Sequence, residues 1–304
     1  MIYDIIIIGA GTAGLTASIY GRRAGKSVLV LEKETFGGQI VYSPAVENYP
    51  GIPSVSGNEF ADSLLSQAEA LGAETDLSGV EKLEIIEKDG AKMFRVTSEY
   101  GEYTGRTVII ATGASHRPLR IEREEELTGS GVSYCALCDG AFCKDRPVAV
   151  VGGGDTACQD AVYLAGVASK VYLIHRRGEF RAERSNVEKA AATGRIEFVM
   201  DSEVTSLNGR NELESISVRN KLTGNVREIK VNGLFVAVGQ TPATAVFKDI
   251  VALDANGYVI AGEDCRTNVP GIFAAGDVRT KKVRQLTTAA ADGAVAATGA
   301  LELL

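Results

Sequence analysis

The stretch that decides the fold is "DIIIIGAGTAGLTASIYGRRAG", residues 4–25. Its apolar run Ile5–Ile8 has the length and branching of a buried strand, and the residues after the glycines have helical spacing. Gly9 permits a tight turn, Gly11 lets the backbone approach a pyrophosphate, and Gly14 allows close packing of the helix on the strand. The stretch therefore predicts the first strand, turn and helix of a dinucleotide-binding domain.

The next segment, "SVLVLE" at residues 27–32, predicts a second strand that ends in Glu32. A carboxylate at this position accepts hydrogen bonds from the hydroxyls of an unmodified ribose. A lone GxGxxG sequence is weak evidence, but one that follows a strand, opens a helix and precedes such an acid is specific. We therefore expect an adenosine without a 2′-phosphate here, as in FAD or NAD.

The same pattern returns in "RPVAVVGGGDTACQDAVYLAGVASKVYLIHRR", residues 146–177. Val148–Val151 supply the strand, and the small residues Gly152, Gly154 and Ala157 supply a GxGxxA turn before a helical segment. The chain thus contains two copies of one nucleotide-binding pattern.

The second copy differs where its second strand ends, because no acid stands there. The residues at and after this end are basic or ionisable: His175, Arg176, Arg177 and Arg181. A carboxylate would repel a 2′-phosphate, whereas guanidinium groups bind phosphate bidentately. A solvated basic turn is the alternative, but the position favours an NADPH site.

Length and composition limit the class of protein. The 304 residues, 45% of them hydrophobic and 23% charged, indicate a globular protein of about two domains. The net charge of -7 argues against nucleic acid as a partner. The longest uncharged stretch, residues 5–21, contains four glycines and is too short for a membrane span, so we expect a cytoplasmic protein that contacts no membrane.

The C-terminal part contains "TNVPGIFAAGDV", residues 267–278, followed by an alanine-rich segment at 284–304. An apolar strand that ends at Gly276 and Asp277, with a helix N-terminus after it, suits the ribityl hydroxyls and ring edge of a flavin. Alanine-rich helices are also common in ordinary packing. Spacing alone leaves both interpretations open.

The stretch "GVSYCALCDGAFC", residues 131–143, contains Cys135 and Cys138 followed by Asp139. The pair could be a redox disulfide, half of a zinc site or two inert buried thiols. Zinc needs about four ligands, and the chain has only two histidines, His116 and His175. The remaining cysteines are scattered: Cys143, Cys158 and Cys265. We therefore predict no metal, and the position of the pair before the second nucleotide strand favours electron exchange.

Together, nine segments show a resemblance to a known family. They are "GAGTAG" at 9, "FGGQI" at 36, "ENYPG" at 47, "IIATGA" at 109, "CALCDG" at 135, "VVGGGDTA" at 150, "HRRGEFRA" at 175, "GIFAAGDV" at 271 and "RQLTTAAADG" at 284. The chain resembles the low-molecular-weight, bacterial-type thioredoxin reductases from its first strand to its last helix, with the segments in the family's order.

This resemblance implies an α/β fold with two Rossmann-like dinucleotide-binding domains of the three-layer ββα type. An NADPH-binding domain carrying the CxxC, residues 116–244, would be inserted in a discontinuous FAD-binding domain of residues 1–115 and 245–304. The protein would be a homodimer that carries FAD and uses NADPH to reduce the disulfide of thioredoxin or a thioredoxin-like protein.

The resemblance also implies roles for single residues. For FAD they are Gly9, Gly11, Gly14 and Glu32 at the ADP half, Gln39 and Asn48 near the isoalloxazine, Asp277 at the ribityl chain, and Arg284 and Gln285 beside the flavin. For NADPH they are Gly152, Gly154, Ala157, His175, Arg176, Arg177 and Arg181. Cys138 would face the flavin, Cys135 would attack the partner's disulfide, and Asp139 would relay a proton or only cap the turn.

Since the CxxC and the NADPH motif lie on one inserted segment, we expect them to take turns at the flavin by rotation about the crossings near residues 113–118 and 242–247. The larger glutathione reductase type is excluded, because no cysteine precedes Cys135 and no histidine follows His175. Rivals are a flavin reductase that serves ferredoxin or a peroxiredoxin system, and a nucleotide-sensing protein. Departures from the family are Leu137, Ala243 and Val283.

Overall fold

The computed structural model describes residues 1–88 and 90–304, which form two compact units. Unit 1 comprises Met1–Ser115 and Thr241–Leu304, and unit 2 comprises His116–Gln240. The second crossing between the units thus falls after residue 240, four residues before the sequence-predicted boundary at 244. Two short strands, β7 (Ala114–His116) and β16 (Gln240–Pro242), pair where the chain passes between the units.

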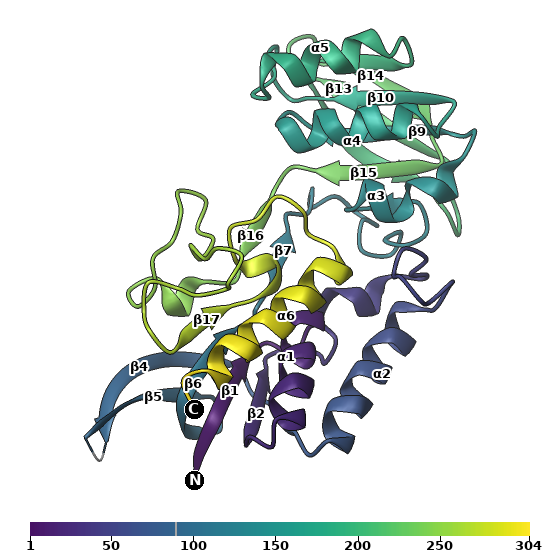
Figure 1. Cartoon of the computed structure of the whole chain (residues 1–304). Helices are drawn as coiled ribbons and strands as arrows, with labels where there is room; N and C mark the ends of the chain where they lie inside the picture. Colours follow the sequence, from purple (N-terminus) through teal and green to yellow (C-terminus); the bar gives the residue numbers. More distant parts are fainter. Residues whose placement is uncertain (89) are drawn as a thin grey trace. The chain divides into compact units, whose positions relative to one another are not determined.

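Unit 1 is built on a mixed sheet whose strands follow the order β3-β2-β1-β6-β5-β4, with β17 also paired to β6 (Figure 1). The strands are β1 (Ile2–Ile8), β2 (Val28–Glu32), β3 (Glu74–Leu77), β4 (Val80–Lys88), β5 (Ala91–Ser98), β6 (Gly101–Ile110) and β17 (Ile272–Ala274). Strands β1, β2, β3, β6 and β17 are parallel, and β4 and β5 join antiparallel.

Alternation along these strands divides the core of unit 1 into two layers. Ile5 and Ile7 of β1 pack with the helices α1 (Thr12–Arg23) and α6 (Leu286–Leu301), while Ile6 and Ile8 pack with β5 and the segment around Phe247. The other helices of unit 1 are α2 (Gly57–Ala70), which packs against α1 (Figure 1), and the 3-10 turns η1 (Gly38–Tyr42), η3 (Ala245–Phe247) and η4 (Gly276–Val278).

Unit 2 places a parallel sheet between helices and a small antiparallel sheet. The parallel order is β11-β10-β9-β15-β8 and the antiparallel order is β12-β13-β14. The strands are β8 (Val132–Ser133), β9 (Pro147–Gly152), β10 (Lys170–Ile174), β11 (Ile196–Val199), β12 (Ser202–Asn208), β13 (Ser215–Asn220), β14 (Val226–Lys230) and β15 (Gly233–Ala237). The helices are α3 (Ala136–Asp139), η2 (Gly140–Cys143), α4 (Asp155–Ala165) and α5 (Arg184–Ala192).

The core of unit 2 has the same two layers. Val148 and Val150 of β9 pack with Leu164 of α4, and Ala149 between them packs with Ile216 and Val218 of β13. This arrangement of helix, parallel sheet and antiparallel sheet confirms the predicted α/β class with Rossmann-like, three-layer units.

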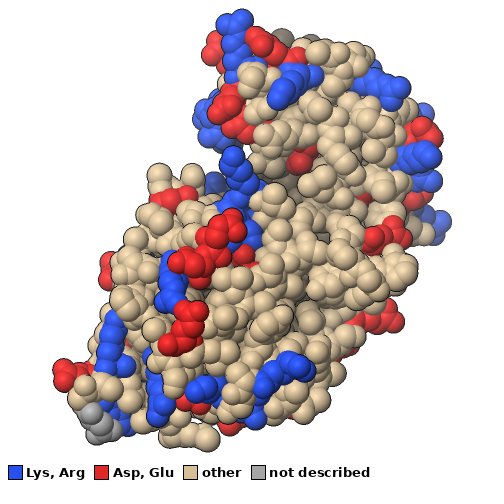
Figure 2. Space-filling view, in the orientation of Figure 1, with Lys and Arg blue, Asp and Glu red and all other residues tan. Residues whose placement is uncertain are grey.

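The outer surface agrees with the mixed charge of the sequence. Figure 2 shows Lys and Arg interspersed with Asp and Glu over the visible face, with wide uncharged areas between them. Within the two described ranges, no helix has both the length and the apolar character that crossing a bilayer would require.

Candidate dinucleotide and redox site

The first glycine turn connects β1 to α1 in unit 1. Gly9 has a positive φ of 106°, and a Cβ there would lie 2.4 Å from the Ala111 carbonyl oxygen. A Cβ at Gly14 would lie 1.9 Å from the Gly9 oxygen, so the helix packs directly on the turn. Gly11, by contrast, has room, since its nearest atom would be the Gly37 oxygen at 3.8 Å. The turn is thus packed on its inner side and open at Gly11.

The N-terminus of α1 suits an anion. Its N-cap residue, Gly11, provides no side-chain hydrogen bond to the first turn. The first N–H groups of a helix lack partners within the helix, and together with the helix dipole they attract negative charge. The pyrophosphate of a dinucleotide would satisfy these groups.

Glu32 lies at the end of β2, next to this turn. Its Oε2 accepts a hydrogen bond from the Ala10 N–H at 2.7 Å, and its Oε1 accepts from the N–H groups of Lys33 at 2.8 Å and Glu34 at 3.0 Å. The carboxylate is therefore held firmly by backbone. Because a carboxylate has about four acceptor positions, one remains for a ribose hydroxyl.

Asp277 gives the clearest test of whether a flavin fits unit 1. It lies in η4, and its Oδ1 is buried without a hydrogen-bond partner among the described residues. Burial raises the pKa of this carboxyl, while Lys281 and Arg284 act in the opposite direction. A buried polar atom without a partner is costly, so this oxygen calls for a donor. A ribityl hydroxyl supplies one, and the residues present fit FAD.

The other predicted flavin residues are held by hydrogen bonds within unit 1. Asn48 donates to the Gln285 side chain at 3.2 Å, and Gln39 donates to the Ala114 carbonyl. Arg284 donates to the backbone oxygen of Asp277 at 3.3 Å, and its guanidinium lies 4.2 Å from the ring centre of Tyr258. The arginine is therefore fixed on both sides.

The second glycine turn connects β9 to α4 in unit 2. A Cβ at Gly152 would lie 2.4 Å from the Ala237 oxygen and 2.6 Å from the Ala157 Cβ, whereas one at Gly154 would meet nothing within 4 Å. Gly154 is the N-cap of α4 and makes no side-chain cap. This turn also has a packed side and an open side, and it fits the pyrophosphate of NADPH in the same way.

The basic residues after β10 separate into two kinds. Arg176, Arg177 and Arg181 are exposed, and none of them forms an ion pair with another described residue. The Arg181 N–H donates to the Gly153 oxygen at 2.7 Å, which brings the arginine segment to the turn. These free cations suit the 2′-phosphate of NADPH.

His175 differs from the arginines. It is only 5% exposed, and a Cβ at Gly153 would lie within 2.0 Å of its ring. The ring stacks on Phe180 at 5.4 Å, and burial lowers its pKa. His175 therefore lies behind the turn in neutral form, while the arginines lie at the surface.

The redox pair occupies the start of α3. Cys135 and Cys138 form a disulfide, with Cα atoms 5.3 Å apart. Cys138 is exposed and Cys135 is half-buried. The Cys138 N–H points at the Cys135 sulfur, 3.2 Å away. After reduction this N–H would stabilise a thiolate on Cys135.

Asp139 is held beside the pair. Ser133 Oγ donates to its Oδ2 at 2.6 Å and also accepts the Cys135 N–H at 3.0 Å. Burial raises the pKa of Asp139, and the bond from Ser133 acts in the opposite direction. A carboxyl with a raised pKa retains a proton more readily, as a proton donor requires.

The remaining cysteines are free and buried: Cys143, Cys158 and Cys265. Burial raises the pKa of each thiol, in the case of Cys265 to about 12. Such thiols are unreactive. Across the described ranges no group of three or more His, Cys, Asp or Glu side chains is arranged to hold a metal ion.

Three contributors were missed from the sequence. Ser133 shows no local signal, because a serine before a CxxC is unremarkable. Tyr258 comes into play only through the long-range contact with Arg284. Asp155 starts α4, and its Oδ1 accepts hydrogen bonds from the Glu183 N–H and from the Asn186 side chain, both of which follow the arginine segment. These partners are 28 and 31 residues away, so the sequence did not reveal them.

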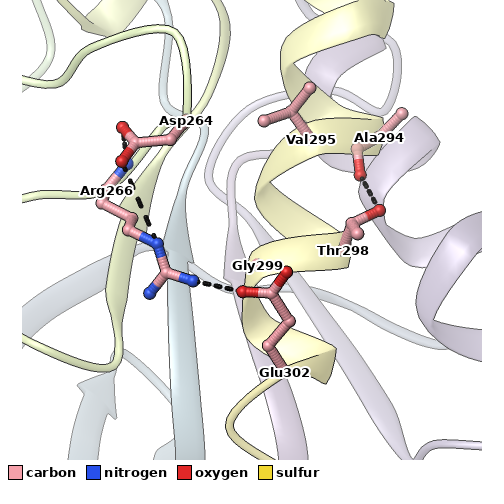
Figure 3. A pocket seen from close by; sticks show the side chains of 7 residues that line it. All are labelled: Asp264, Arg266, Ala294, Val295, Thr298, Gly299 and Glu302. Carbon is pink, nitrogen blue, oxygen red and sulfur yellow. Dashed lines mark hydrogen bonds and ion pairs between the residues drawn. The ribbon is translucent and has the colours of Figure 1, made fainter.

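A hollow of about 290 Å³ lies elsewhere in unit 1, between the end of α6 and the loop with Asp264 and Arg266. Figure 3 shows Arg266 reaching from that loop to Glu302, with Val295 and Thr298 on the facing helix. None of the predicted site residues lines it.

Two glycine turns, each following a strand that is paired in parallel with its neighbours, together with a disulfide beside an acid, define a dinucleotide-dependent disulfide oxidoreductase. Residues 3–293 match the pyridine nucleotide-disulphide oxidoreductase family. The chain is 43% identical over 296 residues to a thioredoxin reductase of Listeria innocua, covering 97% of this chain and 92% of that protein. It is 43% identical over 306 residues to one of Peptoclostridium acidaminophilum, covering 98% and 96%.

A solved structure agrees with these relatives. Thioredoxin reductase from Streptococcus pyogenes matches with a TM-score of 0.94 and 40% identity, covering 99% of this chain and 98% of that one. The chain therefore belongs to the thioredoxin reductases, within the pyridine nucleotide-disulphide oxidoreductase family.

Proposed function

We propose that this protein uses NADPH to reduce the disulfide of thioredoxin or a thioredoxin-like protein, with FAD bound in unit 1 and NADPH in unit 2. The observation that carries the proposal is the Cys135–Cys138 disulfide with Asp139 beside it, in the same unit as the arginine-bearing glycine turn. The names of the relatives support the choice of partner.

The chain's own residues fall into three tasks. Gly9, Gly11, Gly14 and Glu32 would bind the adenosine half of FAD, and Asp277 its ribityl chain; Gln39, Asn48, Arg284 and Gln285 would lie near its ring. When bound, FAD converts the hydride of NADPH into an electron pair that a disulfide can accept. Gly152, Gly154, Ala157 and the exposed Arg176, Arg177 and Arg181 would bind NADPH, with His175 supporting the turn from behind.

The disulfide carries the electrons out of the protein. Two electrons and two protons convert Cys135–Cys138 into a pair of thiols. The Cys135 thiolate, stabilised by the Cys138 N–H, attacks the partner's disulfide and forms a mixed disulfide. Cys138 then attacks Cys135, releases the partner as a dithiol and restores the internal disulfide. Asp139 supplies a proton to the thiolate that leaves on the partner. The hydrogen bond from Ser133 orients the Asp139 carboxyl group.

Further features are part of the proposal. The disulfide and the NADPH turn belong to unit 2, and the FAD residues belong to unit 1. The disulfide and the bound NADPH would therefore reach the flavin alternately, by rotation of unit 2 at the crossings β7 and β16. A disulfide engineered between these crossings should permit one half-reaction and abolish turnover; normal turnover would contradict rotation. We also propose a cytoplasmic homodimer.

The decisive experiment follows the electrons in order. NADPH is added without oxygen to the purified yellow protein, the flavin absorbance is recorded, and oxidised thioredoxin is supplied before free thiols are counted. We expect bleaching by NADPH, then recovery of the flavin absorbance as thioredoxin gains two thiols. Failure with NADPH but bleaching by reduced ferredoxin would show that the donor is wrong.

Two variants separate the stages. Cys138→Ser should abolish thioredoxin reduction because no internal disulfide can form. Asp139→Asn should bleach normally with NADPH but reduce thioredoxin slowly. If Asp139→Asn turned over at the normal rate, Asp139 would only cap the turn. If the wild-type protein bound FAD that NADPH did not bleach, the proposed enzyme activity would fall and a binding protein would remain.

A further inference from the structure

A buried group of three charges lies beneath the turn that contains Asp277. Asp292 stands in the middle of α6, an otherwise alanine-rich helix, and is only 6% exposed. The side chains of Arg279 and Lys281, with which it pairs, are 9% and 8% exposed. We call these three residues the α6 charge cluster.

The contacts of Asp292 are unusually complete. Arg279 donates to both of its oxygens, each at 2.8 Å, and Lys281 donates to Oδ2 at 2.8 Å. The Gly276 N–H also donates to Oδ2, at 2.9 Å. A bidentate arginine, a lysine and a backbone donor therefore converge on one carboxylate, which fixes it more firmly than any single ion pair.

The contact with Gly276 links the cluster to the candidate flavin site. Gly276 has a φ of +78°, and a Cβ there would lie 2.9 Å from the Ala13 Cβ of α1. The next residue is Asp277, whose Oδ1 has no partner among the residues described. Asp292 therefore holds the Ala275–Gly276 peptide, one peptide before Asp277, and so restrains the backbone that carries the Asp277 carboxyl group.

The cations of the cluster are also tied to the turn. Arg279 donates to the Ala261 and Thr280 carbonyls, and its own carbonyl accepts from Arg284 at 3.3 Å. Arg284 in turn donates to the Asp277 carbonyl. A single network thus extends from the middle of α6 to Asp277 and Arg284, two of the predicted flavin residues.

We propose that Asp292, together with Arg279 and Lys281, is a positioning residue that sets the affinity of the protein for FAD by holding the Gly276–Asp277 turn against α6. This inference rests on the proposed binding of FAD in unit 1. Asp292 acts through the backbone of the turn and has no part in electron transfer. A role in fold stability alone would be simpler, so the experiment measures fold stability and FAD affinity separately.

The test uses two variants of the full chain and one control. Asp292→Asn removes the charge and leaves two buried cations without their partner. The triple variant Asp292→Leu, Arg279→Met, Lys281→Met removes all three charges, and such apolar replacements of buried ion pairs often preserve stability. The control Glu302→Gln removes the exposed ion pair with Arg266 beyond the end of the same helix (Figure 3).

The measurements are the midpoint of thermal unfolding, the affinity for FAD from the fluorescence of flavin released by the holoprotein, and the affinity for NADP⁺. We expect both cluster variants to bind FAD about tenfold or more weakly, a loss comparable to that seen when hydrogen-bond support behind metal ligands is removed. The triple variant should do so even with its unfolding midpoint near that of the wild type. The affinity for NADP⁺ should be unchanged in both cluster variants. The control Glu302→Gln should bind FAD as the wild type does.

Either of two results would overturn the inference. One is a triple variant that retains wild-type FAD affinity; the other is an Asp292→Asn variant that unfolds more easily yet binds FAD normally, which would make the cluster structural only. A wild-type protein that failed to bind FAD would instead refute the proposed function itself, and this inference with it.

Discussion

The two glycine turns of this chain have the same form but are braced by different residues. In unit 1, Glu32 at the end of β2 accepts a hydrogen bond from the N–H of Ala10, the second residue of the turn. In unit 2, His175 directly after β10 packs its ring against Gly153, also the second residue of its turn. A carboxylate braces one turn through a hydrogen bond, and a neutral ring braces the other through packing.

We propose that this difference lets one backbone pattern bind two different nucleotides. Glu32 combines the brace with a negative charge, which suits a ribose hydroxyl and rejects a phosphate. In unit 2 the brace is uncharged, so the arginines that follow it remain exposed and unpaired among the described residues. The position of the brace is shared, and we propose that its charge sets the preference of each turn for its nucleotide.

The largest effect should come from the third small residue of each turn. Gly14→Ala would place its Cβ 1.9 Å from the Gly9 oxygen, which forces α1 away from β1. We expect a loss of about 1–3 kcal/mol in the free energy of unfolding and a protein purified without flavin. Unit 2 already has Ala157 here, and Ala157→Gly should cost only about 1 kcal/mol. Denaturant unfolding and flavin content measure both.

Equal losses at the two positions would contradict this asymmetry. A Gly14→Ala protein that retained FAD would show that the turn of unit 1 has more room than the contacts of Gly14 indicate.

The next effect concerns the arginines of unit 2. Removing Arg177 and Arg181 by substitution with alanine should raise KM for NADPH about tenfold or more per guanidinium, since hydrogen bonds to charged groups contribute about 1.5–3 kcal/mol. KM for NADH should not change, because NADH has no 2′-phosphate. Steady-state kinetics with both nucleotides measure the effect.

Arg184→Ala is the matched control, because Arg184 is also exposed but is paired with Glu188. If the double variant raised KM for NADPH and for NADH equally, these arginines would not recognise the 2′-phosphate.

A smaller effect is expected at the brace of unit 1. Glu32→Gln preserves the shape of the side chain but replaces one acceptor oxygen with an NH₂ group, which cannot accept from backbone N–H groups. We expect FAD affinity to fall about tenfold, corresponding to a loss of about 1–2 kcal/mol. Fluorescence of released flavin gives the affinity. Unchanged affinity would mean that FAD binding requires neither the charge of Glu32 nor its second acceptor oxygen.

The sequence predicted the features that depend on neighbours along the chain. Apolar runs and glycine spacing were enough for both turns and for the α/β class, because the strand, the turn and the helix of each pattern follow one another along the chain. The sequence analysis assigned His175 and Arg176 to the same NADPH-binding group because they are adjacent. In the structure His175, directly after the strand, is buried, whereas Arg176 is exposed. Adjacency did not reveal that difference.

Contacts between distant segments could not be predicted in this way. Asp292 meets Gly276 across 16 positions, and Arg284 meets Tyr258 through packing that no local pattern encodes. An acid within an alanine-rich helix was a visible signal at Asp292. Its partners became identifiable only when the fold brought α6 against the turn.

The smallest expected effect is a pH dependence of folding stability that arises from buried groups in unit 2. Both histidines, His116 and His175, belong to unit 2, and burial lowers the pKa of each. Such groups stay neutral in the folded state, so the stability they contribute is full above the ordinary histidine pKa, about 6.5, and is lost as the pH falls towards the folded pKa. Asp160, also in unit 2, acts in the opposite direction: burial raises its pKa to about 6, so the folded state takes up its proton first and gains stability in acid.

These opposing signs predict an order among variants, measured as the fall in unfolding midpoint between about pH 7.5 and pH 5.5. His175→Phe removes a group that loses stability in acid, so its midpoint should fall less than that of the wild type. Asp160→Asn removes a group that gains stability in acid, so its midpoint should fall more. Unit 1 contributes no histidine to this range. If the midpoint of His175→Phe fell more than that of the wild type, His175 would be charged in the folded protein. A charged ring behind Gly153 would contradict the neutral brace that distinguishes the second turn from the first.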